Sequence, residues 1–267
     1  MTRRAASAAL ALGLLAAAGC APRAVRAPAL DASSVAERHA AALAARRAVG
    51  EALDAEARVW VGGSAFGELP AVSAVLALGG PDACRLRVQS LFGTALDVAA
   101  RGDSLEAFVP PRRLALRLPA AAARLGVRDP GGLAVRVWSA GWEPPRAAWA
   151  AAAWRDSLLE VTWLEDGDTL SVGVGISGLP GTARLARPGG PVVRAAYRRW
   201  QPVEGTAWPS RVDFEDEAGT VRITCRVDRA RRPARPDRAR LVARIPDDAE
   251  VLEWDDLRRA IARLGGL

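Results

Sequence analysis

The side chains that most often act in catalysis or bind metals are scarce in this sequence. Its 267 residues include one histidine, His39, and three cysteines, Cys20, Cys84 and Cys225. A catalytic nucleophile needs a base within hydrogen-bond reach, and a zinc site needs a full set of nitrogen and sulfur ligands. One histidine and two cysteines in strand-like surroundings supply neither. The sequence therefore predicts a protein that is not an enzyme and has no metal or cofactor.

Two glycine-rich segments come close to functional motifs without completing them. Gly173–Gly178 has GxGxxG spacing, but Leu179 and Pro180 follow where a dinucleotide site requires the start of a helix. Residues 62–66 depart from the nucleophile-elbow pattern at its last position. We interpret the first segment as the end of a glycine-rich strand. The acidic run 215–217 could bind Ca²⁺ weakly, and a solvated turn explains it better.

Cys20 is the one residue with a specific predicted chemistry. Arg3 and Arg4 precede about 14 apolar residues, which is typical of a secretory signal peptide. The run is too short for a membrane span, which needs about 20 residues. Ala17-Ala18-Gly19-Cys20 resembles the bacterial lipobox, although Ala17 stands where Leu is usual. This resemblance implies cleavage before Cys20 and acylation of its thiol. An ordinary signal peptide with an incidental cysteine is the alternative.

The predicted anchor divides the chain into three parts. Residues 1–19 form the signal peptide, residues 20–33 the lipidated N-terminus and a tether, and residues 34–267 a single domain. Pro22 and Pro28 would keep the tether extended. The residue after the cysteine is Ala21 and not Asp, which, in the sorting scheme that the lipobox implies, favours the outer membrane. We expect a lipid-anchored protein that faces the periplasm.

The charge comes entirely from arginine. The formal net charge is +7, and the chain contains no lysine. Binding to nucleic acid is disfavoured, because the predicted protein is exported and its arginines alternate with apolar residues as on strands. Arg222–Arg244 is denser, with nine arginines and two aspartates. This segment is either a solvated hairpin or a face that settles on phosphate-rich lipid headgroups.

The spacing of apolar residues predicts a mainly β protein with helices (α+β). Ser33-Ser34 would cap a helix over Val35–Ala57, and Asp129-Pro130 would open another over residues 131–140. A helical turn at Ala120–Leu125 and a closing helix at Leu257–Leu264 complete the helices. Short alternating runs between Gly, Pro and Asp turns indicate about eleven or twelve antiparallel strands. Thirteen runs are candidates for these strands: Val59–Phe66, Ala71–Leu78, Cys84–Ser90, Ala95–Arg101, Leu105–Val109, Leu114–Leu118, Leu158–Leu164, Thr169–Ile176, Ala183–Ala186, Val192–Trp200, Ser210–Phe214, Thr220–Val227 and Arg240–Ile245.

Three stretches resemble the LolA/LolB-like superfamily of bacterial lipoprotein and lipid carriers. Arg85–Gly93 is similar to its strand that ends in an apolar-Gly corner. Tyr197–Trp200 followed by Ala207–Val212 is similar to the late aromatic hairpin of that superfamily. Arg244–Pro246 is similar to its closing strand. The resemblance implies an unclosed half-barrel of about eleven strands, lidded by helices. No residue could be identified as a counterpart of the protruding apolar loop residue of the outer-membrane receptor.

That resemblance implies an apolar concave face, which would bind acyl chains of a lipid or lipoprotein. Helix residues Leu133 and Trp138, with Trp142, would form a lid or an interface with a membrane. Alternatively, the apolar side chains fill a core, and the protein is a structural envelope lipoprotein in a larger assembly. The predicted cavity residues are Val72, Leu76, Leu78, Leu86, Val88, Leu96, Val98, Leu114 and Leu116.

Two further questions stay open at the level of sequence. Cys84 and Cys225 lie on the apolar side of predicted strands, so they form either a disulfide or two buried thiols. Nine tryptophans accompany a single tyrosine, and four of them fall between Trp138 and Trp154. Such a cluster suits either a membrane interface, where indole rings favour the headgroup level, or core packing.

Overall fold

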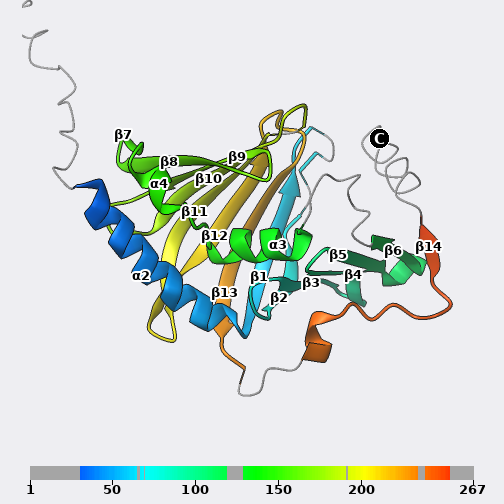
Figure 1. The fold of residues 1–267 in the computed structure, drawn as a ribbon. Helices are drawn as coiled ribbons and strands as arrows, with labels where there is room; N and C mark the ends of the chain where they lie inside the picture. Colours follow the sequence, from blue (N-terminus) through cyan, green and yellow to red (C-terminus); the bar gives the residue numbers. More distant parts are fainter. Residues whose placement is uncertain are drawn as a thin grey trace, which may run out of the picture.

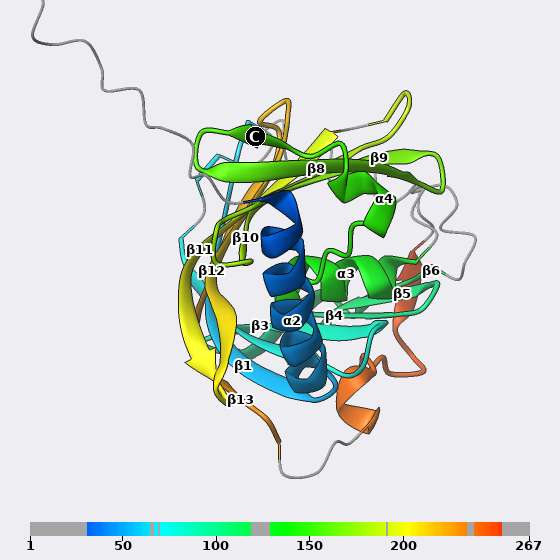
Figure 2. The same cartoon turned by 60° about the vertical axis from the view of Figure 1, so that its left-hand side comes forward.

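A computed structural model of the chain describes residues 31–64, 67–68, 70–118, 129–190, 192–233 and 238–252. Most of these residues belong to one curved β-sheet. The sheet wraps around helices α2 (Ala32–Gly50) and α3 (Pro130–Ser139), which lie on its concave side (Figures 1 and 2). A short helix, α4 (Arg146–Trp149), covers the same side near strand β8.

The sheet contains fourteen strands in the order β14-β6-β5-β4-β3-β2-β1-β13-β12-β11-β10-β9-β8-β7. All neighbours are antiparallel except β14 and β6, which pair in parallel. The unclosed half-barrel predicted from the sequence is therefore confirmed, and the strand count and the fully antiparallel pairing are corrected. The strands are β1 (Leu53–Gly62), β2 (Val72–Leu78), β3 (Ala83–Ser90), β4 (Gly93–Arg101), β5 (Ser104–Val109), β6 (Leu114–Leu118), β7 (Ala153–Arg155), β8 (Leu158–Glu165), β9 (Asp168–Val174), β10 (Pro180–Ala186), β11 (Val192–Val203), β12 (Thr206–Asp216), β13 (Arg222–Arg231) and β14 (Glu250–Leu252).

The N-terminal helix is shorter than its sequence predicts. It begins after Asp31, which occupies the N-cap position in place of Ser33-Ser34, and it ends at Gly50 instead of Ala57. Strand β1 then starts at Leu53, because residues 53–59 alternate between buried and more exposed positions. Alanine fits a helix and a strand equally well in size, so the alanines of this segment concealed the change of period.

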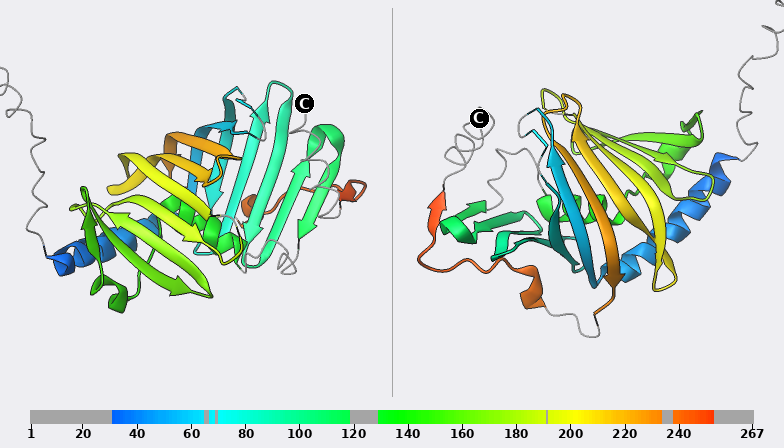
Figure 3. Two further views of the ribbon diagram at one scale, coloured as in Figure 1. Left: turned by 90° about the horizontal axis from the view of Figure 1, so that it is seen from above. Right: turned by 180° about the vertical axis from the view of Figure 1, so that it is seen from behind.

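The predicted strand Arg240–Ile245 is wrong. Arg238–Leu241 forms a short 3₁₀ helix, η4, which contacts β2 and β3 on the side of the sheet opposite α3 (Figures 1 and 3). Leu241 packs against Ala77 and Ala83 there. The last strand is β14 instead, and β7 was also missed. The helices expected at 120–125 and 257–264 lie outside the described residues.

The core consists mainly of two apolar clusters on the concave side. One lies beneath α4 and the start of α2, around Trp142, Val161, Val172 and Tyr197. The other lies beneath α3 and the end of α2, around Trp208, which is fully buried. The helices thus fill much of the hollow that the curved sheet encloses.

Cys84 and Cys225 are buried free thiols. Cys84 lies on β3 and Cys225 on β13, and strands β2 and β1 separate them. Three strand spacings amount to about 14 Å, beyond the about 7 Å limit between Cα atoms for a disulfide. Burial raises the pKa of both thiols to about 12, so they stay protonated near neutral pH.

Candidate lipid-binding face

The nine predicted cavity residues lie on the concave face of strands β2, β3, β4 and β6. One row of directly paired residues runs across the sheet from β2 to β6. In order, its members are Leu76, Leu86, Val98, Ala107 and Leu116. The next row joins Val88 to Leu96. Because side chains of directly paired residues point to the same side, each row forms a continuous apolar band.

Helix α3 lies across this face and is positioned by close backbone contacts. The Asp129 side chain accepts a 2.7 Å hydrogen bond from the Gly132 N–H, which caps the helix. The Gly131 N–H donates to the Gly102 carbonyl at 3.0 Å. A Cβ atom at Gly131 would lie 2.0 Å from the Asp82 carbonyl oxygen, so only glycine permits this approach. The start of α3 is thereby fixed to two turns of the sheet.

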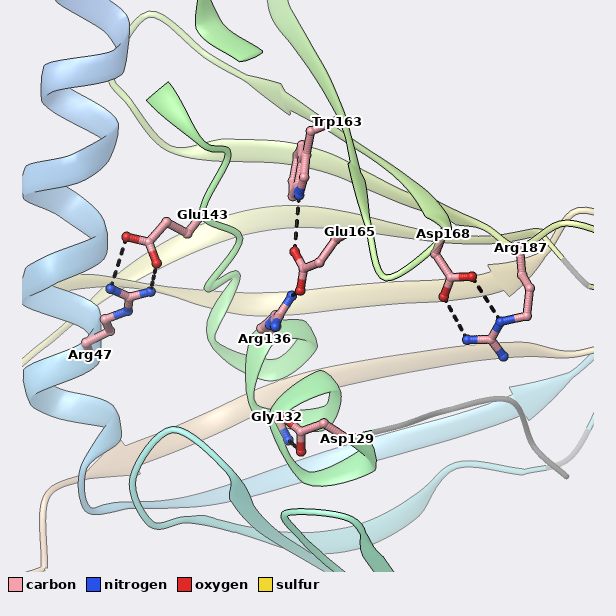
Figure 4. Close-up of polar contacts among 9 residues, drawn as sticks. All are labelled: Arg47, Asp129, Gly132, Arg136, Glu143, Trp163, Glu165, Asp168 and Arg187. Carbon is pink, nitrogen blue, oxygen red and sulfur yellow. Dashed lines mark hydrogen bonds and ion pairs between the residues drawn. The ribbon is translucent and has the colours of Figure 1, made fainter. Parts of the chain in front are cut away.

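Ion pairs hold the other end of α3 and the loop that follows it (Figure 4). Arg136 on α3 donates to Glu165 at the end of β8, at 2.5 Å, and Glu165 also accepts from the Trp163 indole at 3.1 Å. Glu143 in the following loop pairs with Arg47 on α2. These contacts are half-buried or exposed, so each contributes little energy, but together they define the position of the helix.

The predicted cavity residues differ in how far the helices cover them. Leu76, Leu78 and Leu116 are at most 5% exposed, and the first two belong to the cluster around Trp208. Val72 and Leu86 are half-buried and pack beside Trp138 in a cluster around Cys225. Four members are likewise half-buried, but they join none of the clusters formed by the described residues. They are Val88, Leu96, Val98 and Leu114.

The three predicted lid residues occupy different surroundings. Trp138 on α3 is half-buried and packs against the same cluster around Cys225 as Leu86 does. Leu133 is half-buried against the cluster around Tyr197. Trp142 is only 3% exposed and lies inside that same cluster, so its indole faces neither solvent nor the apolar band.

Sequence reasoning missed the most exposed apolar residues of the described chain. Leu91 and Phe92 form the turn between β3 and β4, and they are 98% and 99% exposed. The Ser90 hydroxyl donates to the Gly93 carbonyl at 3.0 Å and accepts from the Phe92 N–H at 3.2 Å, which orders the turn. The signal was present in the sequence, because Leu-Phe stands where a turn between strands usually carries polar residues.

A buried arginine lies between α2 and the sheet. Arg46 is fully buried, and its guanidinium carbon is 5.4 Å from the centroid of the Trp200 ring. One nitrogen, Nη2, donates to the Ala140 carbonyl at 3.4 Å, while Nε and Nη1 have no hydrogen-bond partner among the described residues. Burial lowers the pKa of Arg46 to about 10, so the group remains charged at neutral pH.

The described residues form neither a metal-binding cluster nor a membrane-spanning helix. No three His, Cys, Asp or Glu side chains within the described ranges gather closely enough to hold a metal ion. Likewise, none of the helices in that part of the chain is both long and apolar enough to cross a membrane.

His39 links α2 to two loops. Its Nδ1 lies 3.0 Å from the Gly178 carbonyl oxygen, and its Nε2 lies 2.8 Å from the Trp142 carbonyl oxygen.

Comparison with solved structures identifies the architecture. A LolA superfamily protein from Nitrosomonas europaea superposes with a TM-score of 0.54 at 16% identity, over 80% of this chain and 99% of the other. A DUF1329 family protein from Desulfovibrio piger gives 0.51 at 9% identity, over 77% and 96%. No family model and no curated protein matches the sequence. At these identities the likeness concerns architecture, and the chain has a LolA-like fold.

Proposed function

We propose that this protein binds acyl chains of a lipid or lipoprotein on its concave face and takes part in their transport or localisation in a bacterial envelope. The apolar band of Val88, Leu96, Val98 and Leu114, which are half-buried and belong to no core cluster of the described residues, is the observation that carries the proposal. Contiguous apolar surface in a soluble domain commonly marks a binding site. Each methylene of a bound chain that leaves water contributes about 0.8 kcal/mol.

The turn between β3 and β4 extends this band towards a membrane. Val88 pairs with Leu96 only two residue pairs from the turn, and Leu91 and Phe92 project beyond it. An acyl chain leaving a bilayer at the turn would meet apolar side chains along β3 as far as Leu86 and Trp138. The proposed acyl anchor at Cys20 would keep the domain at an outer-membrane surface.

Leu96→Asp tests the binding face. A carboxylate in the band would cost several kcal/mol to bury against a bound chain. We expect binding of cis-parinaric acid to weaken at least about tenfold, with a smaller effect on the melting temperature than a core substitution would have, because half-buried Leu96 belongs to none of the core clusters of the described residues. Leu164→Asp is the matched control, since Leu164 is 76% exposed on β8. The parent chain should carry Cys20→Ser, so that no acyl group of its own competes.

The outcomes separate the proposal from its rival. A parent chain that binds no fatty acid, or equal binding by the Leu96→Asp and Leu164→Asp variants, would favour a structural envelope lipoprotein with a filled interior. Leu86→Trp is a second variant that distinguishes the two proposals. It would occupy ligand space and block uptake in a carrier, whereas in a filled core it would overpack the site and cost about 1 to 3 kcal/mol.

The membrane contact and the anchor are tested separately. Leu91→Ser with Phe92→Ser should reduce binding of the Cys20→Ser chain to phospholipid vesicles, while Leu164→Ser should not. In the unmodified chain, mass spectrometry of the N-terminal peptide should find acyl groups on Cys20. Unchanged vesicle binding by the double variant would remove the turn from the proposal, and an unacylated Cys20 would remove the anchor.

A further inference from the structure

The outer, convex face of the sheet carries a second hollow, of about 630 Å³, lined by six arginines. It lies over β1–β5 and β13 and is bordered by η4 and the segment that follows it. The centre of the hollow lies over β2, which contributes only the short side chains of Val75 and Ala77 to the lining. Longer side chains rise around it, and the arginines among them are Arg85, Arg87, Arg229, Arg231, Arg240 and Arg244.

The carboxylates of the hollow cannot neutralise these arginines. Asp54, Glu56 and Asp97 are the acidic groups in the lining, which leaves a formal excess of three positive charges. Arg85 takes both oxygens of Asp97, through Nε at 2.8 Å and Nη2 at 2.6 Å. This pair is 6% and 5% exposed, so it is a fixed part of the wall.

The remaining acids have partners as well. Arg240 pairs with Asp54 and donates from Nη2 to the Leu78 carbonyl at 2.8 Å. Arg229 lies 3.7 Å from Glu56, and both side chains are largely exposed. Each carboxylate of the lining is therefore already engaged with an arginine.

Three guanidinium groups of the lining have no ion pair with any described residue. Arg87 stands directly opposite Asp97 in the register of β3 and β4, but Arg85 already occupies both oxygens of that carboxylate. Among the residues that the structure describes, the guanidinium groups of Arg231 and Arg244 also have no carboxylate within 4.0 Å, although the Arg244 backbone N–H donates to Asp97 at 3.4 Å. In addition, the Nε of Arg240 is buried in the lining without an acceptor.

We propose that this hollow binds the phosphate group of an organic phosphate, with Arg87, Arg231 and Arg244 as its ligands. Guanidinium groups match phosphate oxygens in geometry and charge. The hollow is much larger than a phosphate ion, and Val75, Ala77 and Phe108 give it apolar surface for the rest of the molecule. This site is on the opposite side of the sheet from the acyl-binding face and does not depend on it.

The chemistry fits two sources, a soluble phosphate ester and the headgroup of an anionic phospholipid. Calorimetry of the full chain carrying Cys20→Ser, with glycerol 3-phosphate and with pyrophosphate, tests the first. Sedimentation with phosphatidylcholine vesicles, with and without phosphatidylglycerol, tests the second. In both arms the reading is the difference between the parent chain and its arginine variants, so that binding by other parts of the chain cancels.

Arg87→Gln and Arg244→Gln are the test variants, and Arg101→Gln is the matched control. Arg101 is exposed at the end of β4, lies outside the lining and has no ion pair with the described residues. Each test variant should weaken binding about tenfold, as expected for a hydrogen bond between charged groups. The control should bind like the parent, and all three should melt within a few degrees of it.

Each pattern of results has a definite meaning. Weakened binding of glycerol 3-phosphate identifies a soluble organic phosphate as the ligand. An effect confined to vesicles with phosphatidylglycerol identifies a lipid headgroup. Absence of binding in both arms, or equal loss in the Arg101→Gln control, would overturn the proposal and leave a solvated arginine surface.

Discussion

Trp142 donates its indole N–H to the phenol oxygen of Tyr197 over 2.6 Å in the interior of the protein. The two residues are 3% and 4% exposed. Trp142 belongs to the loop after α3, and Tyr197 to β11, so this bond ties the helices of the concave side to the sheet. Burial raises the pKa of Tyr197 above its usual value, and its hydroxyl is protonated at all physiological pH values.

Tyr197→Phe should destabilise the protein by about 1 to 3 kcal/mol, because the buried Trp142 N–H loses its acceptor. Trp142→Phe combined with Tyr197→Phe should cost less than the sum of the single changes, since no donor is then left unpaired. Urea unfolding of the four proteins measures this coupling. Strictly additive effects would show that the bond contributes nothing to stability.

The two most buried arginines should respond in opposite ways to replacement by methionine. Arg85 is paired with Asp97 through two short hydrogen bonds. Arg85→Met would leave the buried Asp97 carboxylate without its ion-pair partner and with only the 3.4 Å contact from the Arg244 N–H, at a cost of about 3 to 5 kcal/mol. Arg46 has no carboxylate, and two of its nitrogens lack acceptors. Arg46→Met should therefore change stability by less than about 1 kcal/mol, or increase it.

The two methionine variants serve as each other's control, because they remove the same charge and add the same side chain. Urea unfolding at neutral pH gives both values. A loss at Arg46 as large as that at Arg85 would mean that the contacts of its guanidinium with Trp200 and the Ala140 carbonyl outweigh its two unpaired nitrogens.

Alternation of apolar residues was enough to predict most of the sheet from the sequence. Strand β6 has the predicted bounds, Leu114–Leu118, and β3 differs from the prediction by one residue. The failures have physical causes. Alanine-rich residues 51–57 fit a helix and a strand alike, whereas β7 and β14 contain three residues each, too few to show a period. The 238–245 segment follows a strand-like pattern but packs on the outer face through Leu241.

The sequence could predict which side of a strand is apolar, but not what covers it. The predicted face holds together because residues such as Leu86 and Val98 are directly paired. That Leu76 is fully buried while Val88 is only half-buried depends on where α3 crosses the sheet, which is set by contacts distant in sequence. The unpaired state of Arg87 could not be predicted either, since it depends on which neighbour engages Asp97.

Gly178 should be intolerant of any side chain because it touches α2. Its φ is +81°, and a Cβ atom there would lie 2.5 Å from the Arg38 carbonyl carbon. Gly178→Ala should cost more than about 3 kcal/mol, from the left-handed backbone and the overlap together. Gly189→Ala is the control, since its φ is +68° and nothing lies within 4 Å of a Cβ there. It should cost only about 1 to 2 kcal/mol, and equal losses in thermal unfolding would contradict the contact.

His39 is the only histidine of the chain and should make stability depend on pH near neutrality. It is 2% exposed. Burial lowers the pKa of its ring, because the charged form loses hydration, and this outweighs the opposing effect of the Trp142 and Gly178 carbonyls. In the neutral form only one ring nitrogen carries a proton, so only one of the two carbonyl contacts is a hydrogen bond.

The expected pH dependence follows from that lowered pKa. An unfolded chain protonates His39 at its usual pKa near 6.5, and the folded chain does so only at lower pH. The unfolded state therefore binds more protons below about pH 6.5, and stability falls as pH decreases through this range. Carboxylates contribute mainly below about pH 5. Urea unfolding between about pH 5.5 and 7.5 should show the slope in the parent and not in His39→Gln. A parent that became more stable on acidification would mean instead that the two carbonyls hold the ring in its charged form.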